Sequence, residues 1–249
     1  MTALAIELQK IHRRKIWLIV TALIGTQFLW LLWSFRTMDA YRLSQGFRHC
    51  LYNLPLINAI MMPLLISVIA SRLCDIEHKG QTLKLLQTIQ SPGRLFDAKF
   101  LCGALHVIAT VFIQFLLILL MGKIKGFTEP LPADKLLFYL FATVSVNLTI
   151  LALQQVLSLL FVNQMIALTI GLIGSFAGLF SMFFPQGWQK IILWGYYGVL
   201  MQVGMNWEKD TRFLDLYYTP IDQYGLLLLG ILFLVIYAAG RYLFVRKEQ

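Results

Sequence analysis

The sequence has few charged residues and none of three common hydrolase motifs. Only 13% of its 249 residues are charged, against about 25% in an average soluble domain, and 59% are hydrophobic. It contains no GxxxxGK[ST], HExxH or GxSxG, which excludes a P-loop ATPase site, a zincin site and a serine-hydrolase elbow of these types. With a mean hydropathy of +0.72, most of the chain is expected to lie in lipid.

The sequence also gives little support for a metal site, a redox site or ion-coupled transport. The three cysteines, Cys50, Cys74 and Cys102, are odd in number and lack zinc spacing, so we expect ordinary small apolar residues. The apolar runs contain no Asp or Glu, although such carboxylates usually mark proton relays and ion-coupled transport. No basic domain lies outside the apolar runs to bind nucleic acid, and we expect no cofactor or metal in the chain.

Charge-free apolar runs predict six transmembrane helices. A bilayer core about 30 Å thick requires roughly 20 apolar residues per helix. The predicted spans are residues 16–35, 51–71, 100–122, 136–161, 164–184 and 222–241. Residues 136–189 hold no charge at all, so we place a tight turn near 161–164. Strands are not expected, because the runs do not alternate as barrel strands do. The predicted fold is a single all-α polytopic membrane domain over residues 1–249.

The basic residues predict the orientation. With six spans, twelve of the 21 Lys and Arg residues flank the spans on the side of both termini, and nine lie opposite. Because cytoplasmic loops are enriched in Lys and Arg, this bias places both termini in the cytoplasm. Leu4, Leu8 and Ile11 form a stripe that leaves out Glu7, which predicts an amphipathic helix on the headgroups.

Two further segments lie on the predicted outer side. Residues 191–205 are too short and too rich in glycine for a confident span, so we expect an interfacial or re-entrant element; a seventh span is the alternative. Residues 207–218 mix aromatic and charged side chains. Their acids, Glu208, Asp210 and Asp215, would attract a cationic peptide, although a solvated loop explains them equally well.

Several polar side chains occur inside the predicted spans. Each would be costly facing lipid, so we expect it to face another helix or a cavity. A translocation path and simple hydrogen bonding between helices both explain them. The candidates for a path are Asn53, Asn58, His106, Gln114, Asn147 and Gln154.

The most polar stretch of the interior lies between the second and third spans, at residues 75–99. Leu83, Leu86 and Ile89 predict one face of a helix, and the sequence Ser-Pro-Gly at residues 91–93 ends it. An exposed helix held between two spans suits a protein partner, and a connector on the membrane surface is the alternative. The residues follow in the order Glu77, Gly80, Thr82, Lys84, Leu85, Leu86, Pro92, Arg94 and Lys99.

This order resembles the permease subunits of ABC-2 type transporters. The resemblance covers the whole chain in layout and is sequence-specific over residues 72–99. It implies an N-terminal elbow helix, a coupling helix after the second span and an outer re-entrant element. The coupling residues it implies are Glu77, Gly80, Thr82, Leu83, Leu86, Pro92 and Arg94, with Glu77 meeting a base on the ATPase or capping the helix.

The resemblance also implies partners. A separate cytoplasmic P-loop ATPase dimer would bind ATP and Mg²⁺, and a second permease, the same or different, would complete the transporter. In size and texture the chain most resembles permeases that expel lantibiotics and related antimicrobial peptides, which implies an amphipathic peptide as cargo. The competing hypothesis is a membrane scaffold or sensor that uses the same segment to bind a signalling protein without transport.

Overall fold

The computed structural model describes residues 3–37, 39–80, 90–208 and 213–247. Within these residues, six helices are long and apolar enough to cross a membrane, and the predicted all-α polytopic class is confirmed. They are α2 (Ile16–Ser34), α4 (Gly46–Gly80), α6 (Pro92–Lys125), α7 (Ala133–Leu160), α8 (Gln164–Ser181) and α11 (Gln223–Lys247). Two short helices, α1 (Ala3–Arg13) and α3 (Ala40–Leu43), precede α2 and α4.

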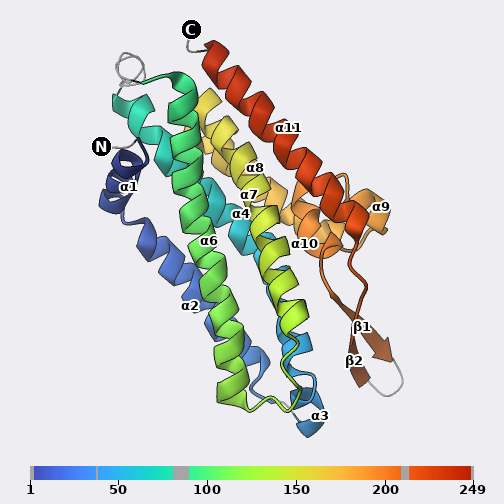
Figure 1. Cartoon of the computed structure of the whole chain (residues 1–249). Helices are drawn as coiled ribbons and strands as arrows, with labels where there is room; N and C mark the ends of the chain where they lie inside the picture. The colour runs from blue at the N-terminus through green and yellow to red at the C-terminus, as the bar shows by residue number, and fades with distance from the viewer. Residues whose placement is uncertain (1–2, 38, 81–89, 209–212, 248–249) are drawn as a thin grey trace.

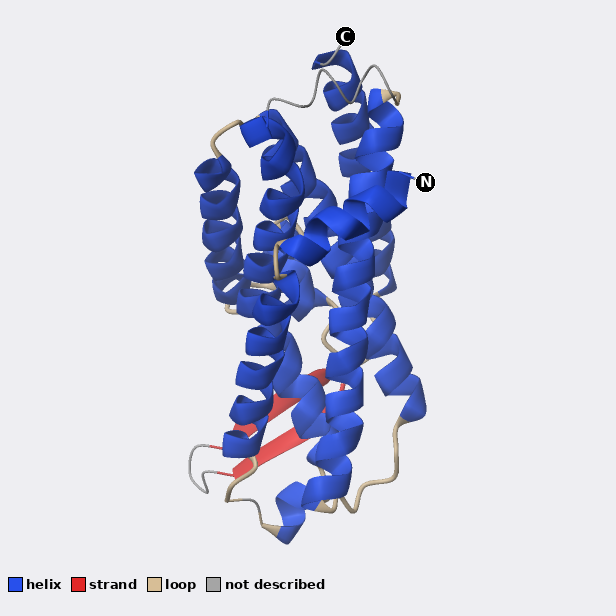
Figure 2. Cartoon of the chain, turned by 90° about the vertical axis from the view of Figure 1, so that its left-hand side faces the viewer, coloured by secondary structure: helices blue, strands red, loops and turns tan. Residues whose placement is uncertain are grey.

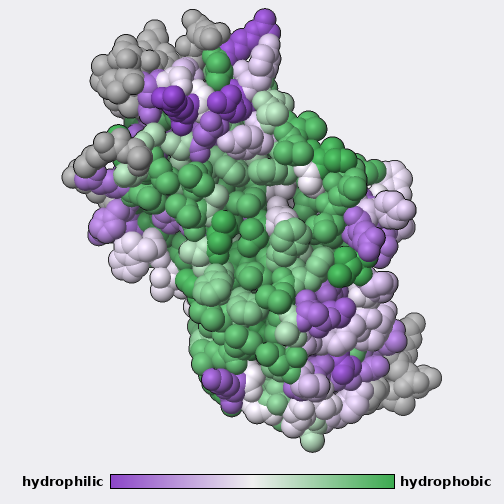
Figure 3. All heavy atoms as spheres, in the orientation of Figure 1, coloured by the Kyte–Doolittle hydropathy of each residue, from purple (hydrophilic) through white to green (hydrophobic). Residues whose placement is uncertain are grey.

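Helix α4 is the centre of the bundle. Of its most apolar stretch 67% is buried, against 17% for α2 and 11% for α11, so the latter two lie at the periphery. Both termini lie at the end of the molecule opposite the strands (Figures 1 and 2). Between the two ends, apolar side chains form a belt on the surface (Figure 3), as expected where lipid is the solvent. The chain is therefore a multi-pass membrane protein.

The turn between α7 and α8 lies where the absence of charge placed it. Helix α7 ends at Leu160 and α8 begins at Gln164. The side chain of Asn163 accepts a hydrogen bond from the backbone N–H of Met165 at 3.0 Å and so caps the N-terminus of α8. Two antiparallel helices therefore come from one uninterrupted apolar stretch.

The segment between α8 and α11 does not add a seventh span. It forms three short elements, α9 (Gln186–Gln189), η1 (Leu193–Gly195) and α10 (Tyr196–Val199), all too short to cross a membrane. Tyr196 and Tyr197 are buried, and α10 contacts α4, α7 and α8. The alternative of a span at 191–205 is therefore wrong.

A β-hairpin follows and corrects the expectation that strands are absent. Strands β1 (Val203–Glu208) and β2 (Phe213–Tyr218) pair antiparallel, with Val203 opposite Tyr218 and Glu208 opposite Phe213. Val203 and Leu216 are buried in the core, on the face that meets the bundle. The alternation of side chains that marks a strand extends over only six residues in each strand. Both strands lie outside the apolar runs from which we expected no strands.

Candidate functional site

Four charged side chains meet where α1 lies against α4 and α6. The Nζ of Lys99 lies 3.0 Å from an oxygen of Glu7 and 2.8 Å from one of Glu77. The Nζ of Lys10 lies 2.6 Å from the other oxygen of Glu7 and 2.8 Å from the other oxygen of Glu77. Each carboxylate thus pairs with both ammonium groups. We call these four residues the charge cluster.

The charge cluster is buried and electrically balanced. Lys99 has an exposed fraction of 0% and also donates to the carbonyl oxygen of Leu73 at 2.7 Å. Glu7 and Glu77 are buried as well. Two negative and two positive charges cancel, and a buried ion is tolerated only when it is paired in this way. The cluster therefore fixes α1 to the last turns of α4 and the early turns of α6.

Two expectations are corrected by this cluster. Glu7 was placed on the polar face of α1 but is buried, because Lys99 lies beneath the helix and supplies a counter-ion. Glu77 was expected to meet a base on the ATPase or to cap a helix, and its carboxylate instead pairs with Lys10 and Lys99 of its own chain. The sequence offered one signal for this cluster. Lys99 directly precedes the predicted span 100–122, and a lysine that is buried there requires an acid nearby.

Three of the other predicted coupling residues lie outside the described residues, and three flank that gap. Thr82, Leu83 and Leu86 are outside the described residues. Gly80 ends α4, and Pro92 is the first residue of α6, where its missing N–H costs no hydrogen bond. Arg94, in the first turn of α6, is exposed. The charge cluster thus lies at the ends of the two helices that the predicted coupling segment connects.

A second ion pair attaches α11 to the start of α6. The guanidinium of Arg241 donates to both carboxylate oxygens of Asp97, at 2.9 and 3.2 Å. The hydroxyl of Tyr237 donates to the same carboxylate at 2.8 Å. Sequence reasoning missed this contact, because 144 residues separate its partners. The first turns of α6 are therefore attached to α1 on one side and to α11 on the other.

Two of the predicted path residues meet in a buried amide network. Gln114 donates to Gln27 at 2.8 Å and to Asn58 at 3.1 Å, and Gln27 donates to Asn58 at 2.9 Å. Asn58 in turn donates to the hydroxyl of Tyr139 at 3.1 Å. Gln27 and Tyr139 were missed by sequence reasoning. The network joins α2, α4, α6 and α7, and its amides bond to one another in the bundle interior.

The remaining path candidates lie apart from this network. Asn53 and His106 each contact a carbonyl one turn back on their own helix. Asn147 accepts a hydrogen bond from the hydroxyl of Tyr197. Gln154 is buried where α7 approaches α8. The six candidates therefore do not line one continuous surface among the described residues.

Replacing Gln114 with Leu is expected to weaken the bundle moderately. The substitution removes the three hydrogen bonds that Gln114 makes with Gln27 and Asn58 and leaves both of these amides partly unpaired. At about 0.6 kcal/mol for each bond inside a membrane, we expect a loss of about 2 kcal/mol. Thermal unfolding in detergent measures this loss, and Ala109→Leu on the exposed face of α6 is the control. A stability equal to that of the control would contradict the network.

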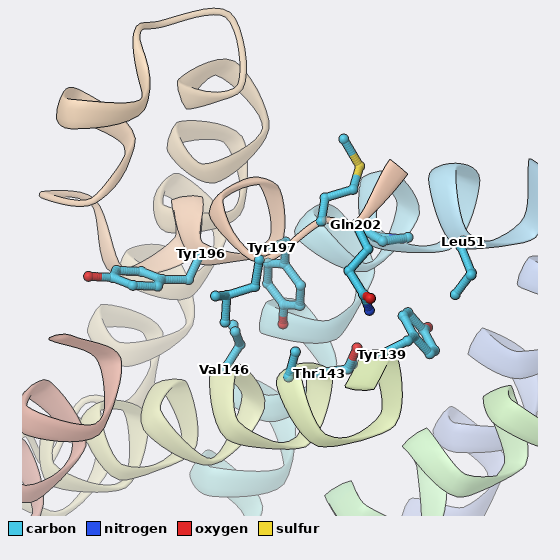
Figure 4. Close-up of a pocket in the computed structure, with 11 residues that line it drawn as sticks. Leu51, Tyr139, Thr143, Val146, Tyr196, Tyr197 and Gln202 are labelled. Atoms are coloured by element: carbon cyan, nitrogen blue, oxygen red, sulfur yellow. The ribbon is translucent and has the colours of Figure 1, made fainter. Parts of the chain in front are cut away.

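A small cavity separates the outer short helices from α7 (Figure 4). Tyr139 and Thr143 line it from α7, and Tyr197 and Gln202 from the opposite wall. Its volume is about 20 Å³, close to that of one water molecule. A cavity of this size is too small to hold a peptide in this conformation.

The larger apolar recess lies on the side of the bundle. Its volume is about 530 Å³, and its lining comes from α2, α4 and α8: Thr26, Leu29, Trp30, Leu56, Ile57, Ile60, Met61 and Leu179. Trp30 and Trp33 pack against each other with ring centroids 5.4 Å apart. We call this recess the lateral groove. It has the size and character of a site for an apolar or amphipathic ligand.

The predicted outer acids contribute one described contact. Asp215 accepts hydrogen bonds from Gln45 at 2.6 Å and from Tyr41 at 3.0 Å, which attaches the hairpin to α3 and to the residue before α4. These bonds, with that from Gln45 the larger cause, lower the pKa of Asp215. The contact is thus fully present above the usual pKa of 3.8 and is lost as the pH falls through the lowered value. Glu208 ends β1, and Asp210 lies outside the described residues.

Glu129, in the connection between α6 and α7, also attaches the hairpin. Its carboxylate pairs with Arg48 at 2.8 Å and accepts from the backbone N–H of Phe47 at 3.1 Å. The hydroxyl of Tyr218 in β2 donates to it at 3.1 Å. This contact was not foreseen, because nothing in the local sequence links the three segments.

Comparison with known proteins identifies the family. A family model described as ABC-2 family transporter protein matches residues 3–178, from α1 to α8, which is more than half of the chain. No curated protein and no solved structure matches the chain significantly. The matched region contains the charge cluster, the amide network and all of the lateral groove except Leu179. The chain therefore belongs to the ABC-2 family of transporter proteins, whose members are the membrane subunits of the transporter and not its ATPase.

Proposed function

We propose that the chain is one permease of an ATP-driven exporter in a bacterial cytoplasmic membrane, with both termini in the cytoplasm. A separate P-loop ATPase dimer binds ATP and Mg²⁺ and docks on residues 80–90. The observation that carries this proposal is the charge cluster at the ends of the two helices that this segment connects. Membership of the ABC-2 family supports an ATPase partner.

The ion pairs among α1, α4, α6 and α11 indicate how a displacement of the docking segment is transmitted to these helices. Glu77 lies in the last turn of α4, before the docking segment, and Lys99 lies in the early turns of α6, after it. Their ion pair of 2.8 Å joins the two helices directly. Because Glu7 and Lys10 share these charges, α1 moves with them as an elbow helix. The pair between Asp97 and Arg241 extends the unit to α11. Closure of the ATPase dimer thus tilts the helices together instead of bending one of them.

The cargo path is proposed to lie between two permeases. The amide network fills the interior of one bundle, and the cavity of Figure 4 holds about 20 Å³. The lateral groove, about 530 Å³, opens on the side of the bundle along α2, α4 and α8. A second permease, the same or different, completes the site when it covers this groove.

The proposed cargo is an amphipathic antimicrobial peptide of the lantibiotic type, expelled from the membrane to protect the cell. Support comes from the apolar lining of the lateral groove, which offers burial to apolar and aromatic side chains. Glu208, Asp210 and Asp215 carry the negative charge that attracts a cationic peptide.

The double substitution Leu83→Asp and Leu86→Asp tests the docking segment. Two charges on the apolar face of the segment are expected to remove the ATPase from the purified complex and to abolish peptide resistance. Leu131→Asp is the matched control, because Leu131 is exposed on the opposite side of the membrane between α6 and α7. Both results are measured in cells that carry the chain, its ATPase and its partner permease.

The outcomes separate the parts of the proposal. Full recovery of the ATPase with the double variant would show that residues 80–90 are not the dock. Recovery of a kinase or protease in place of an ATPase would favour the scaffold or sensor. Normal docking without peptide resistance in the unaltered complex would leave the permease standing and overturn the peptide as cargo.

A further inference from the structure

A second recess lies at the end of the molecule that carries the hairpin, away from the lateral groove. It has a volume of about 530 Å³ and is bounded by α9, α10 and the segments before β1 and after β2. Its walls mix polar and apolar groups, and the residues that matter here are Gln186, Lys190, Val199, Thr219, Ile221 and Asp222. We call it the headgroup recess, for reasons that follow.

One wall of the headgroup recess presents two opposite charges. The Nζ of Lys190 lies 2.5 Å from a carboxylate oxygen of Asp222, and both side chains remain partly exposed. The second oxygen of Asp222 accepts from the backbone N–H of Gly225 at 2.8 Å. Although burial opposes ionisation, the bonds from Lys190 and Gly225 lower the pKa of Asp222. The recess thus offers one fixed anion beside one longer, more adaptable cation.

Large exposed aromatic side chains flank these two residues in sequence. Phe183 and Tyr224 have exposed fractions of 82% and 84%, and Trp188 and Ile191 are exposed as well. Aromatic residues of this kind concentrate where the hydrocarbon core meets the lipid headgroups. These side chains place the headgroup recess at the depth of the headgroups, and Val199 and Ile221 give it an apolar wall.

We propose that the headgroup recess binds a zwitterionic phospholipid, with the lipid phosphate on Lys190 and its ammonium group on Asp222. Two intermolecular pairs replace one internal, partly exposed pair, so the two charges keep partners when that pair opens. An anionic lipid lacks the ammonium group and leaves Asp222 without its partner. The site therefore prefers phosphatidylethanolamine to phosphatidylglycerol. The proposed orientation of the chain would place this lipid in the outer leaflet, and lipid binding itself does not rest on that orientation.

Native mass spectrometry of the full-length chain in detergent tests the site with these two lipids, matched in acyl chains. The unaltered chain is expected to bind phosphatidylethanolamine roughly tenfold more tightly, a modest free-energy difference. Asp222→Asn keeps an acceptor for the N–H of Gly225 but loses the charge, so the preference is expected to disappear. Lys190→Gln is expected to weaken the binding of both lipids. Lys123 is an exposed lysine on α6, and Lys123→Gln is expected to change the binding of neither lipid.

Three results would overturn the proposal. One is equal binding of the two lipids by the unaltered chain, and another is an unchanged preference in Asp222→Asn. The third concerns the source of the headgroup. Glycerophosphoethanolamine, which has no acyl chains, is expected to bind at least roughly tenfold more weakly than the lipid. Equal binding would identify a soluble zwitterion as the ligand. None of these outcomes depends on the ATPase or on the peptide.

Discussion

Replacing Lys99 with Met is expected to lower the Tm of the purified chain by about 10 °C. The substitution removes a fully buried ammonium group that pairs with Glu7 and Glu77. Lys10 alone then faces two buried carboxylates, and breaking a buried pair costs about 3–5 kcal/mol. For a chain of this size, each kcal/mol corresponds to about 2–4 °C.

Two further variants separate charge balance from packing. Lys123→Met makes the same change on the exposed surface of the same helix and is expected to leave Tm unchanged. The double variant Lys99→Met with Glu77→Gln removes one charge of each sign, so part of the lost stability is expected to return. If Lys99→Met unfolded at the temperature of the unaltered chain, the charge cluster would not hold α1 to the bundle.

Replacing Gly178 with Leu is expected to displace the short outer helices. A Cβ at Gly178 would lie 2.6 Å from the backbone carbonyl oxygen of Trp194 and 2.7 Å from its Cβ. Backbone atoms of η1 cannot move aside as the end of a flexible side chain does, so the whole element must shift. Overpacking costs about 1–3 kcal/mol when side chains adjust, and we expect the upper end of that range or more. The yield of monodisperse protein and its Tm report the effect.

Gly230 provides the matched control for this substitution. It lies in α11, and no atom lies within 4 Å of the position that its Cβ would occupy. Gly230→Leu is therefore expected to behave like the unaltered chain. A Gly178→Leu protein with the same yield and Tm as Gly230→Leu would mean that α8 and η1 do not pack as closely as the structure shows.

The helices follow from the sequence because lipid leaves a chain few alternatives. A backbone without water must satisfy its hydrogen bonds within the helix, so a charge-free run of about 20 residues is nearly sufficient to predict a span. The turn near residues 161–164 follows from length, because 54 uncharged residues are enough for two helices, and Asn163 caps the second of them. The family, too, was recognisable from the pattern of residues 72–99.

The site depends on contacts that local patterns do not specify. Glu7 and Lys99 are 92 residues apart, and only the docking of α1 on α6 brings them together. Gln27 drew no attention in the first span, yet it completes the amide network with Asn58 and Gln114. The hairpin was missed because a run of six alternating residues is a weak signal beside spans of twenty.

The charge cluster provides a physical basis for the proposed coupling between the ATPase and the permease. Three of the four charged side chains, Glu7, Glu77 and Lys99, are buried, so separating one of them from its partners leaves an ion without solvent. Such a unit transmits a displacement at one end of α4 to α1 and α6 without being distorted itself. The amide network and the outer contacts of Glu129 hold the same helices further along their length. We therefore propose that the bundle tilts as a body against its partner permease.

Isolation of the chain from its native membrane in mild detergent, with mass spectrometry of the proteins that accompany it, tests the central claim most directly. The account predicts a P-loop ATPase in stoichiometric amount, absent from the variant with Leu83→Asp and Leu86→Asp and present with Leu131→Asp. A second six-span protein beside it would identify a complex of two different permeases. A chain that emerges alone, or with a kinase or protease instead, would contradict the proposal that a separate ATPase drives it.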